Sequence, residues 1–136
     1  MHKTYMTNMA NTSSTGKIGE QAAAKFLQGN GYQIIEMNYK NNFGRAIGEI
    51  DIIAKEIASQ ELVFVEVKTR EYHRYKNTLP EENITPSKLR KLSKIASAYL
   101  NFKKLTDANY RFDAVSVWLD QGTNTAKIKH IKSIYL

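Results

Sequence analysis

Residues 15–136 are predicted to form a single α/β domain in which helices pack on one mixed β-sheet. Three observations predict this class. Two segments carry apolar residues at the three-four spacing of a buried helix face, and several others have the apolar alternation typical of strands. Their order along the chain is helix, three strands, helix and two strands, which favours one mixed sheet covered by helices.

The first predicted helix covers residues 15–28. Three consecutive alanines favour a helix there, and an apolar stripe is formed by Ile18, Ala22, Phe26 and Leu27. The sequence Gly29-Asn30-Gly31 is a stop signal, because glycine readily adopts the left-handed conformation of a helix cap. Residues 32–39 alternate loosely and predict the first strand, and residues 40–45 are expected to form a polar, basic loop.

Two more strands are predicted over residues 47–54 and 61–69, joined by a short polar stretch that suits a hairpin turn. Residues 71–83 show no clear period and contain Pro80, so we expect a loop there.

The second helix opens with Thr85 as its N-cap and Pro86 at its first position, and it is expected to end near Lys104. Its buried face is predicted to consist of Leu89, Leu92, Ala96, Tyr99 and Leu100. Residues 110–119 alternate as a fourth strand, and residues 126–135 form the last strand after a short turn.

The composition excludes several classes of protein. No apolar run is long enough to cross a bilayer, and the N-terminus lacks the apolar stretch of a signal peptide, so no membrane partner is expected. Residues 1–14 are rich in Thr, Asn and Ser, and we expect a disordered polar tail. The absence of cysteine rules out disulfides and thiolate metal sites and agrees with a cytoplasmic location.

The net charge of +7, from 20 Lys and Arg residues against 13 Asp and Glu residues, favours a polyanionic partner. Many basic proteins bind no such partner, so the charge alone does not assign a function.

Two of the predicted strands contain acids within apolar sequence, Gly48-Glu49-Ile50-Asp51-Ile52-Ile53 and Val63-Phe64-Val65-Glu66-Val67-Lys68. Acids are costly to bury, so strands that keep them in a core need a reason. Strict alternation places Glu49, Asp51 and Ile53 on one face and Ile50 and Ile52 on the other.

In the next strand, Glu66 and Lys68 share a face. A hairpin that turns near residues 58–59 places Asp51 opposite or nearly opposite Glu66, and Glu49 near Lys68. Two carboxylates and an ammonium group are therefore expected to converge on one patch of the sheet.

Such a patch has the chemistry of a divalent-metal site. Two carboxylates about 4 Å apart repel by roughly 4 kcal/mol at an effective dielectric near 20, and Mg²⁺ or Mn²⁺ removes that cost. The metal can polarise a bound phosphate and lower the pKa of a bound water, while Lys68 can orient or deprotonate that water. The alternative is an ordinary solvated Glu-x-Lys salt bridge between Glu66 and Lys68.

An acid that ends one strand, followed by Glu-x-Lys in the next, resembles the PD-(D/E)xK nuclease superfamily of restriction endonucleases and archaeal Holliday-junction resolvases. The match is closer still to the YraN-like family of small bacterial proteins. The residues that carry the resemblance are Gly19-Glu20, Gly31-Tyr32, Gly48-Glu49-Ile50-Asp51, Phe64-Val65-Glu66-Val67-Lys68-Thr69-Arg70, Lys88, Ala98-Tyr99-Leu100 and Arg111-Phe112-Asp113.

The resemblance implies a restriction-endonuclease-like three-layer fold with a central mixed sheet of four to five strands flanked by helices. It also implies that Asp51 and Glu66 are metal ligands, that Lys68 is the catalytic lysine, and that Glu20 on the first helix completes the metal site. A solvated helix glutamate is the alternative for Glu20. Two departures from the pattern are the missing proline before Asp51 and the missing glycine after Thr69-Arg70.

Basic residues around this patch are candidates for nucleic-acid binding. Lys88, Lys91 and Lys94 recur at near-helical spacing and can form a phosphate-binding ridge, and Arg45 and Arg70 lie in predicted loops beside the site. A solvated helix face is the alternative for the three lysines. Asp113 near Arg111 is expected to be a structural partner rather than a ligand.

These features together predict a Mg²⁺- or Mn²⁺-dependent endonuclease that hydrolyses phosphodiester bonds, with DNA as the expected substrate. Related nucleases often dimerise to cut two strands, so a homodimer is one expected assembly. Two alternatives stay open. The chain could be a non-catalytic nucleic-acid-binding module that keeps the nuclease fold, or a structural protein whose acids form salt bridges.

Overall fold

The computed structural model describes residues 3–6, 14–40, 48–75 and 84–134. Its strands are β1 (Lys3–Met6), β2 (Tyr32–Lys40), β3 (Glu49–Glu56), β4 (Leu62–Glu71), β5 (Tyr110–Asp120) and β6 (Thr125–Ile131). Its helices are α1 (Thr15–Gly29), α2 (Tyr72–Tyr75) and α3 (Pro86–Phe102).

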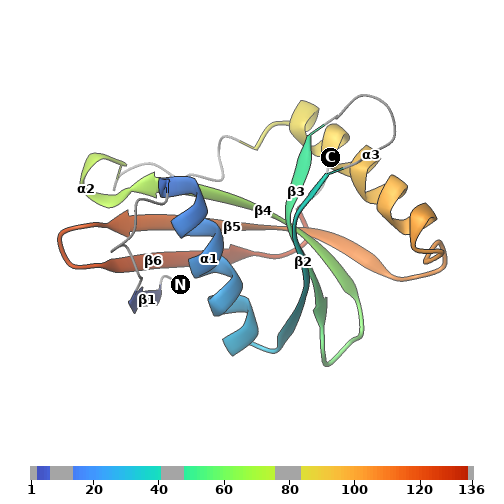
Figure 1. The fold of residues 1–136 in the computed structure, drawn as a ribbon, viewed down its shortest axis with the longest axis horizontal. Helices are drawn as coiled ribbons and strands as arrows, with labels where there is room; N and C mark the ends of the chain where they lie inside the picture. The colour runs from blue at the N-terminus through green and yellow to red at the C-terminus, as the bar shows by residue number, and fades with distance from the viewer. Residues whose placement is uncertain (1–2, 7–13, 41–47, 76–83, 135–136) are drawn as a thin grey trace.

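The strands form one mixed sheet in the order β1-β6-β5-β4-β3-β2. Strands β4 and β5 run parallel, and every other neighbouring pair is antiparallel. Figure 1 shows α1 crossing in front of the central strands, and the residues of α3 pack in a separate core on the opposite face. The predicted α/β class is therefore confirmed, with helices on both faces of the sheet.

The sheet has six strands, so the prediction of four to five was too small. The additional strand is β1, which pairs with β6 and lies within the segment for which the sequence predicts a disordered tail. A strand of four residues is too short to show a clear alternation. Its Tyr5 ring packs edge-on against Phe26 of α1, with 5.5 Å between ring centroids, which a reading of local sequence does not reveal.

Two further differences concern the segments that follow β4 and β5. The short helix α2 lies in the predicted loop 71–83, where the Glu71 carboxylate accepts the backbone N–H groups of His73 and Arg74. Strand β6 ends at Ile131 rather than at residue 135, and β1 pairs along it.

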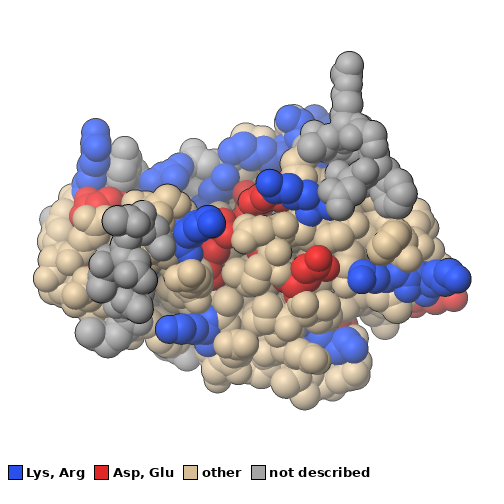
Figure 2. Space-filling model, in the orientation of Figure 1, with Lys and Arg blue, Asp and Glu red and all other residues tan. Residues whose placement is uncertain are grey.

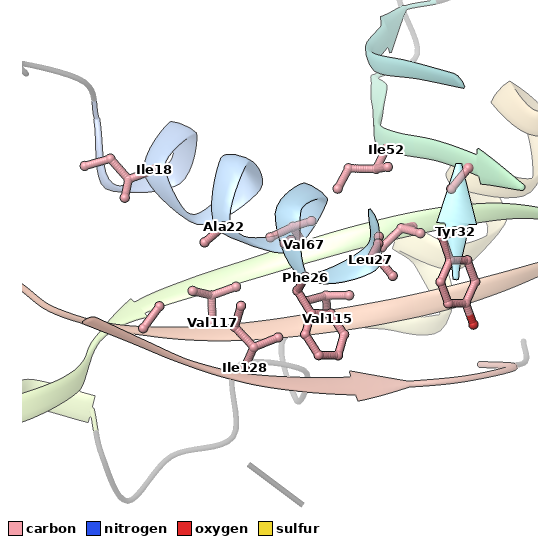
Figure 3. Packing of buried hydrophobic residues seen from close by; sticks show 14 of the residues in the cluster. Ile18, Ala22, Phe26, Leu27, Tyr32, Ile52, Val67, Val115, Val117 and Ile128 are labelled. Carbon is pink, nitrogen blue, oxygen red and sulfur yellow. The ribbon is translucent and has the colours of Figure 1, made fainter. Parts of the chain in front are cut away.

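Helix α1 begins where the Ser14 side chain accepts the backbone N–H of Lys17. Its apolar stripe packs on the sheet, and Figure 3 shows Phe26 and Leu27 among the side chains of Val67, Val115 and Ile128. The stripe predicted for residues 15–28 is therefore the buried face of the helix.

Glycine at position 19 has a specific packing reason. A Cβ atom built there overlaps the Thr69 side chain, lying 2.7 Å from its Cγ2 atom and closer still to its Oγ1 atom. Helix α1 can approach β4 this closely only without a side chain at this position. The next residue, Glu20, is thereby brought to the sheet.

Helix α3 covers the other face. Thr85 accepts the N–H of Lys88 as the N-cap, and Pro86 takes the first helical turn, as predicted. Leu89, Leu92 and Ile95 pack against Ile53 and Phe64 of the sheet. None of the described helices combines the length and the hydrophobicity that crossing a bilayer requires.

Candidate functional site

The strand β3 departs from regular alternation at Asp51. Ile50 and Ile53 both pack in the core beneath α3, whereas Ile52 packs in the core beneath α1. The prediction that Ile50 and Ile52 share a face is therefore wrong. The alternation of side chains along β3 therefore shifts by one residue between Ile50 and Ile52. Asp51 lies at this irregularity, which we call the slip.

The neighbouring strand β2 has a matching irregularity. Its Met37 pairs with Ile52 and its Tyr39 with Ile50, so Asn38 stands across from Asp51. Asn38 has a φ of 53°, in the left-handed region that asparagine tolerates better than most residues. The two irregular residues face each other at one point of the sheet, which brings their polar groups together.

Asp51 is held in place by strand β4. The regular pairing of β3 with β4 ends at Ile52 and Val65. Beyond this pair, the Oδ2 atom of Asp51 accepts the backbone N–H of Val67 at 2.8 Å. The side chain thus takes a position that a backbone carbonyl fills in a regular ladder, and Asp51 is only 8% exposed.

Three carboxylates gather at this point. One oxygen each from Glu20, Glu49 and Asp51 lie within 4.8 Å of one another. The side-chain amide of Asn38 donates to Glu20 Oε1 at 2.7 Å and is 3.3 Å from Glu49 Oε1. Helix α1 and strand β3 therefore form one acidic cluster, by which we mean Glu20, Glu49 and Asp51, and strand β2 supports it through Asn38.

The acidic cluster agrees only in part with the predicted ligand set. Glu20 and Asp51 lie together as the resemblance implies, but the third member is Glu49 rather than Glu66. Glu49 lies two residues before Asp51 in the same motif, so the sequence already indicated Glu49 as a possible neighbour of Asp51. Asn38 was missed, and its one signal is a polar residue between Met37 and Tyr39 in a strand.

The electrostatics of Asp51 are unfavourable for a carboxylate. Burial, followed by repulsion from Glu66, Glu20 and Glu49, raises its pKa to about 8, and the Val67 N–H opposes this only partly. Among the described residues, no Lys or Arg lies within ion-pair distance of Glu20 or Asp51. Glu49 is 3.9 Å from the ammonium group of Lys40, which is largely exposed.

The donor set suits a hard divalent cation. Oxygens that each lie about 2.1 Å from Mg²⁺ are at most about 4.2 Å apart, so the acidic cluster has to contract only slightly around an ion. Carboxylate and amide oxygens are the ligands that Mg²⁺ and Mn²⁺ prefer. The spacing of the three acids is therefore compatible with such an ion, which would offset their mutual repulsion.

Glu66 and Lys68 lie on the α3 side of β4. Their side chains form an ion pair of 3.3 Å and are 15% and 19% exposed. Glu66 lies near enough to Asp51 to raise the pKa of that carboxyl, and its ion pair is with Lys68. In this arrangement, Lys68 neutralises Glu66 rather than the acidic cluster.

A small pocket of about 160 Å³ opens between α3 and the ends of β3 and β4. It is lined by Gly48, Glu49, Glu66, Lys68, Lys88, Lys91, Leu92 and Ile95. The ammonium group of Lys68 lowers the pKa of Lys88, which shows that the two cations lie close together. Two of the three predicted ridge lysines thus reach the site.

The other predicted nucleic-acid contacts have different outcomes. Lys94 is exposed and is not among the lining residues of the pocket. Arg70 is half-buried at the end of β4 and donates to the Thr69 carbonyl. Arg45 lies outside the described residues. Figure 2 shows acidic side chains near the middle of one face, with Lys and Arg side chains around them.

A second buried aspartate, Asp113 on β5, has the opposite surroundings. Its carboxylate is bonded by the Arg111 guanidinium at 3.0 and 3.2 Å, by His130 at 2.8 Å and by the Ser133 N–H at 2.9 Å. Burial alone raises its pKa, but these bonds outweigh burial and lower it below the ordinary value. Arg111 also reaches Glu56 and Glu61, so Asp113 is a structural partner, as predicted.

Sequence comparison places this constellation in a family. The model of the uncharacterised protein family UPF0102 matches residues 19–117. The chain belongs to this family. UPF0102 proteins of Clostridium beijerinckii and Syntrophus aciditrophicus are 40% and 45% identical to it, covering 88% and 82% of the chain and 91% and 81% of those proteins. A UPF0102 protein of Moorella thermoacetica is 38% identical over 88% of the chain and 93% of its own length.

Membership of UPF0102 confirms the YraN-like assignment made from the motifs. The matched segment runs from the close contact of Gly19 to the middle of β5, and so includes the whole acidic cluster and the α3 pocket.

Proposed function

We propose that this protein is a divalent-metal-dependent endonuclease that hydrolyses phosphodiester bonds in DNA. The observation that carries the proposal is the acidic cluster. Three carboxylates from helix α1 and strand β3 meet at a slip in the sheet, without a Lys or Arg paired to Asp51 among the described residues. A buried carboxyl with a raised pKa, such as that of Asp51, beside a pocket that contains three lysines is typical of a functional site.

Glu20, Glu49 and Asp51 are the residues that would hold Mg²⁺ or Mn²⁺, and Glu66 is near enough to Asp51 to join them. When bound, the ion supplies a polarised phosphate and a bound water of lowered pKa. Asn38 orients Glu20 and Glu49, and the Val67 N–H orients Asp51. Such supporting hydrogen bonds keep metal ligands in position.

Lys68 is the chain's own group for the substrate. Its ammonium group pairs with Glu66 at 3.3 Å, at the border between the acidic cluster and the pocket. From there it can orient a water molecule or offset negative charge on the phosphate. The role predicted for Lys68 from the motif is therefore compatible with its place in the fold.

Metal binding is the first test. Calorimetric titration of the metal-free protein with MnCl₂ is expected to show one site that Asp51→Asn removes. The matched control is Asp107→Asn, which makes the same change at an exposed position. Absence of binding in the wild-type protein contradicts the proposal and favours a structural role for the acids.

Cleavage is the second test. Branched, flapped and linear DNA are incubated with Mg²⁺ or Mn²⁺, and the wild-type protein is compared with Asp51→Asn and Lys68→Ala. Both substitutions are expected to lower the rate at least about 100-fold, as loss of a group that stabilises the transition state does. Tight DNA binding without cleavage of any substrate instead indicates the non-catalytic binding module. Cleavage that persists in both variants indicates a contaminating nuclease.

A further inference from the structure

The pocket between α3 and β4 has a charge pattern of its own. Lys68 comes from the sheet, and Lys88 and Lys91 come from the first two turns of α3. Lys68 is paired with Glu66, but within the described part of the chain neither Lys88 nor Lys91 has a carboxylate at ion-pair distance. The α3 side of the pocket therefore presents two cations without a fixed counter-charge.

These lysines contribute little to the stability of the helix. Leu92 and Ile95 attach α3 to the sheet by burial. Lys88 occupies the first turn, where the helix dipole disfavours a cation, and that turn contains no acidic residue. Lys88 also lies near the ammonium group of Lys68, and the nearby Glu66 offsets this repulsion only in part. An anion in the pocket relieves both unfavourable interactions, so the arrangement indicates anion binding.

The position of the pocket suggests which anion. Glu49, a member of the acidic cluster, also lines the pocket, and so does Glu66, which lies near Asp51, so pocket and cluster are contiguous. A nucleic-acid strand whose reacting phosphate lies at the acidic cluster and Lys68 can place a neighbouring phosphate against α3.

We propose that Lys88 and Lys91 together bind the phosphate adjacent to the reacting one, so that the substrate must contain at least two consecutive phosphodiester groups. This inference rests on the proposed function and adds a substrate requirement to it. The subsite recognises the backbone and not the bases, so it gives affinity without sequence preference.

Helix geometry separates this subsite from the rest of the basic surface. Arg90 and Lys94 follow Lys88 by two and six residues, about 200° and 240° around the helix, and neither lines the pocket. Both are exposed. The double variant Arg90→Ala/Lys94→Ala is therefore a matched control for Lys88→Ala/Lys91→Ala, with the same loss of two charges from the same helix.

The experiment measures the binding of a labelled DNA duplex by fluorescence anisotropy at several NaCl concentrations, with CaCl₂ present in place of Mg²⁺. Each phosphate contact contributes about 0.9 to the slope of log K against log salt. Lys88→Ala/Lys91→Ala is expected to reduce the slope by about 0.9, for one phosphate. The control double variant is expected to leave the slope unchanged.

A second measurement uses bis(p-nitrophenyl) phosphate, which has only one phosphodiester group. Lys88→Ala/Lys91→Ala is expected to raise KM for an oligonucleotide by a much larger factor than that by which it lowers the turnover of the small diester. Equal slopes for the two double variants overturn the subsite, and so does an equal loss of turnover on the small diester.

The two proposals can fail separately. If the wild-type protein cleaves nothing but the slope difference appears, the nuclease proposal fails and the phosphate subsite stands. Cleavage without a slope difference supports the nuclease and overturns the subsite. A wild-type protein that binds no DNA overturns both.

Discussion

Two buried aspartates on strands that flank β4 have opposite electrostatic surroundings. Asp113 is fully buried, yet Arg111, His130 and the Ser133 N–H hold its pKa below the ordinary value. Asp51 is almost as buried, but burial and neighbouring acids raise its pKa to about 8.

The difference shows that burial alone does not determine what a carboxylate does in this sheet. Asp113 is surrounded by hydrogen-bond donors and positive charge, so its interactions are complete within the chain. Asp51 has one backbone donor and faces Glu66, Glu20 and Glu49. A bound cation can therefore balance the negative charge of Asp51, which is what a metal-ligand site requires.

The largest effect on stability is expected from a substitution at Asp113, whose carboxylate is fully hydrogen-bonded within the chain. Asp113→Asn removes the charge that Arg111 and His130 face; Arg111 keeps its ion pairs with Glu56 and Glu61, but His130 loses its carboxylate partner inside the fold. We expect the free energy of unfolding to fall by about 3–5 kcal/mol, measured by urea denaturation in the absence of metal. Asp51→Asn is the isosteric comparison and is expected to cause no such loss. A similar loss in both variants contradicts the distinction between the two aspartates.

The second largest effect is expected at Gly19, whose close packing against Thr69 brings Glu20 to the other acids of the acidic cluster. Gly19→Ala places a methyl group on the Thr69 side chain and pushes α1, with Glu20, away from the sheet. We expect a loss of stability of about 1–3 kcal/mol together with weaker Mn²⁺ binding, measured by thermal denaturation and calorimetry.

The matched control is Gly16→Ala in the same helix, where a methyl group meets no atom within 4 Å. That substitution is expected to be neutral or to stabilise the helix by up to about 1 kcal/mol. Unchanged Mn²⁺ affinity in Gly19→Ala shows that the close packing does not position Glu20.

The smallest expected effect is on the pH dependence of folding stability, which has opposite signs for Asp51 and Asp113. The folded-state pKa of Asp51 is raised from 3.8 to about 8, so the folded protein binds this proton more tightly than the unfolded chain. The contribution of Asp51 to stability is therefore largest below pH 4 and is lost as the pH rises towards 8. Asp113, whose pKa is lowered, loses its contribution as the pH falls below the ordinary value instead.

In metal-free buffer, the stability difference between Asp51→Asn and wild type is expected to grow from pH 5 to pH 8. We expect the variant to be more stable by about 1 kcal/mol or more at the upper end, because a single pKa unit corresponds to 1.36 kcal/mol. Thermal denaturation at several pH values measures the difference, and saturating Mn²⁺ is expected to reverse it. A difference that stays constant with pH contradicts the raised pKa of Asp51.

Most of the fold followed from local patterns. The apolar stripes of α1 and α3 and the caps at Thr85 and Pro86 were visible in the sequence because helix periodicity and capping are local properties. Strand β1 and helix α2 were not predicted, since four-residue elements depend on their partners rather than on their own pattern.

The site was predictable by residue type but not in its full membership. The charged residues of two apolar strands made Asp51, Glu66 and Lys68 candidates, and the predicted hairpin placed them near one another. The slip opposite Asn38 was not predictable, because strict alternation assumes a regular strand. That slip makes Glu49, rather than Glu66, the third member of the acidic cluster.

The sequence by itself determined the class of fold, the family, and which titratable residues stand in apolar strands, because these depend on periodicity and on residue identity. Only the tertiary structure decided which charges meet. Whether a buried carboxylate receives an arginine, as Asp113 does, or three other acids, as Asp51 does, depends on atoms within a few ångströms contributed by distant segments. Coulomb energies at such distances amount to several kcal/mol inside a protein, so this placement separates a structural acid from a candidate metal ligand.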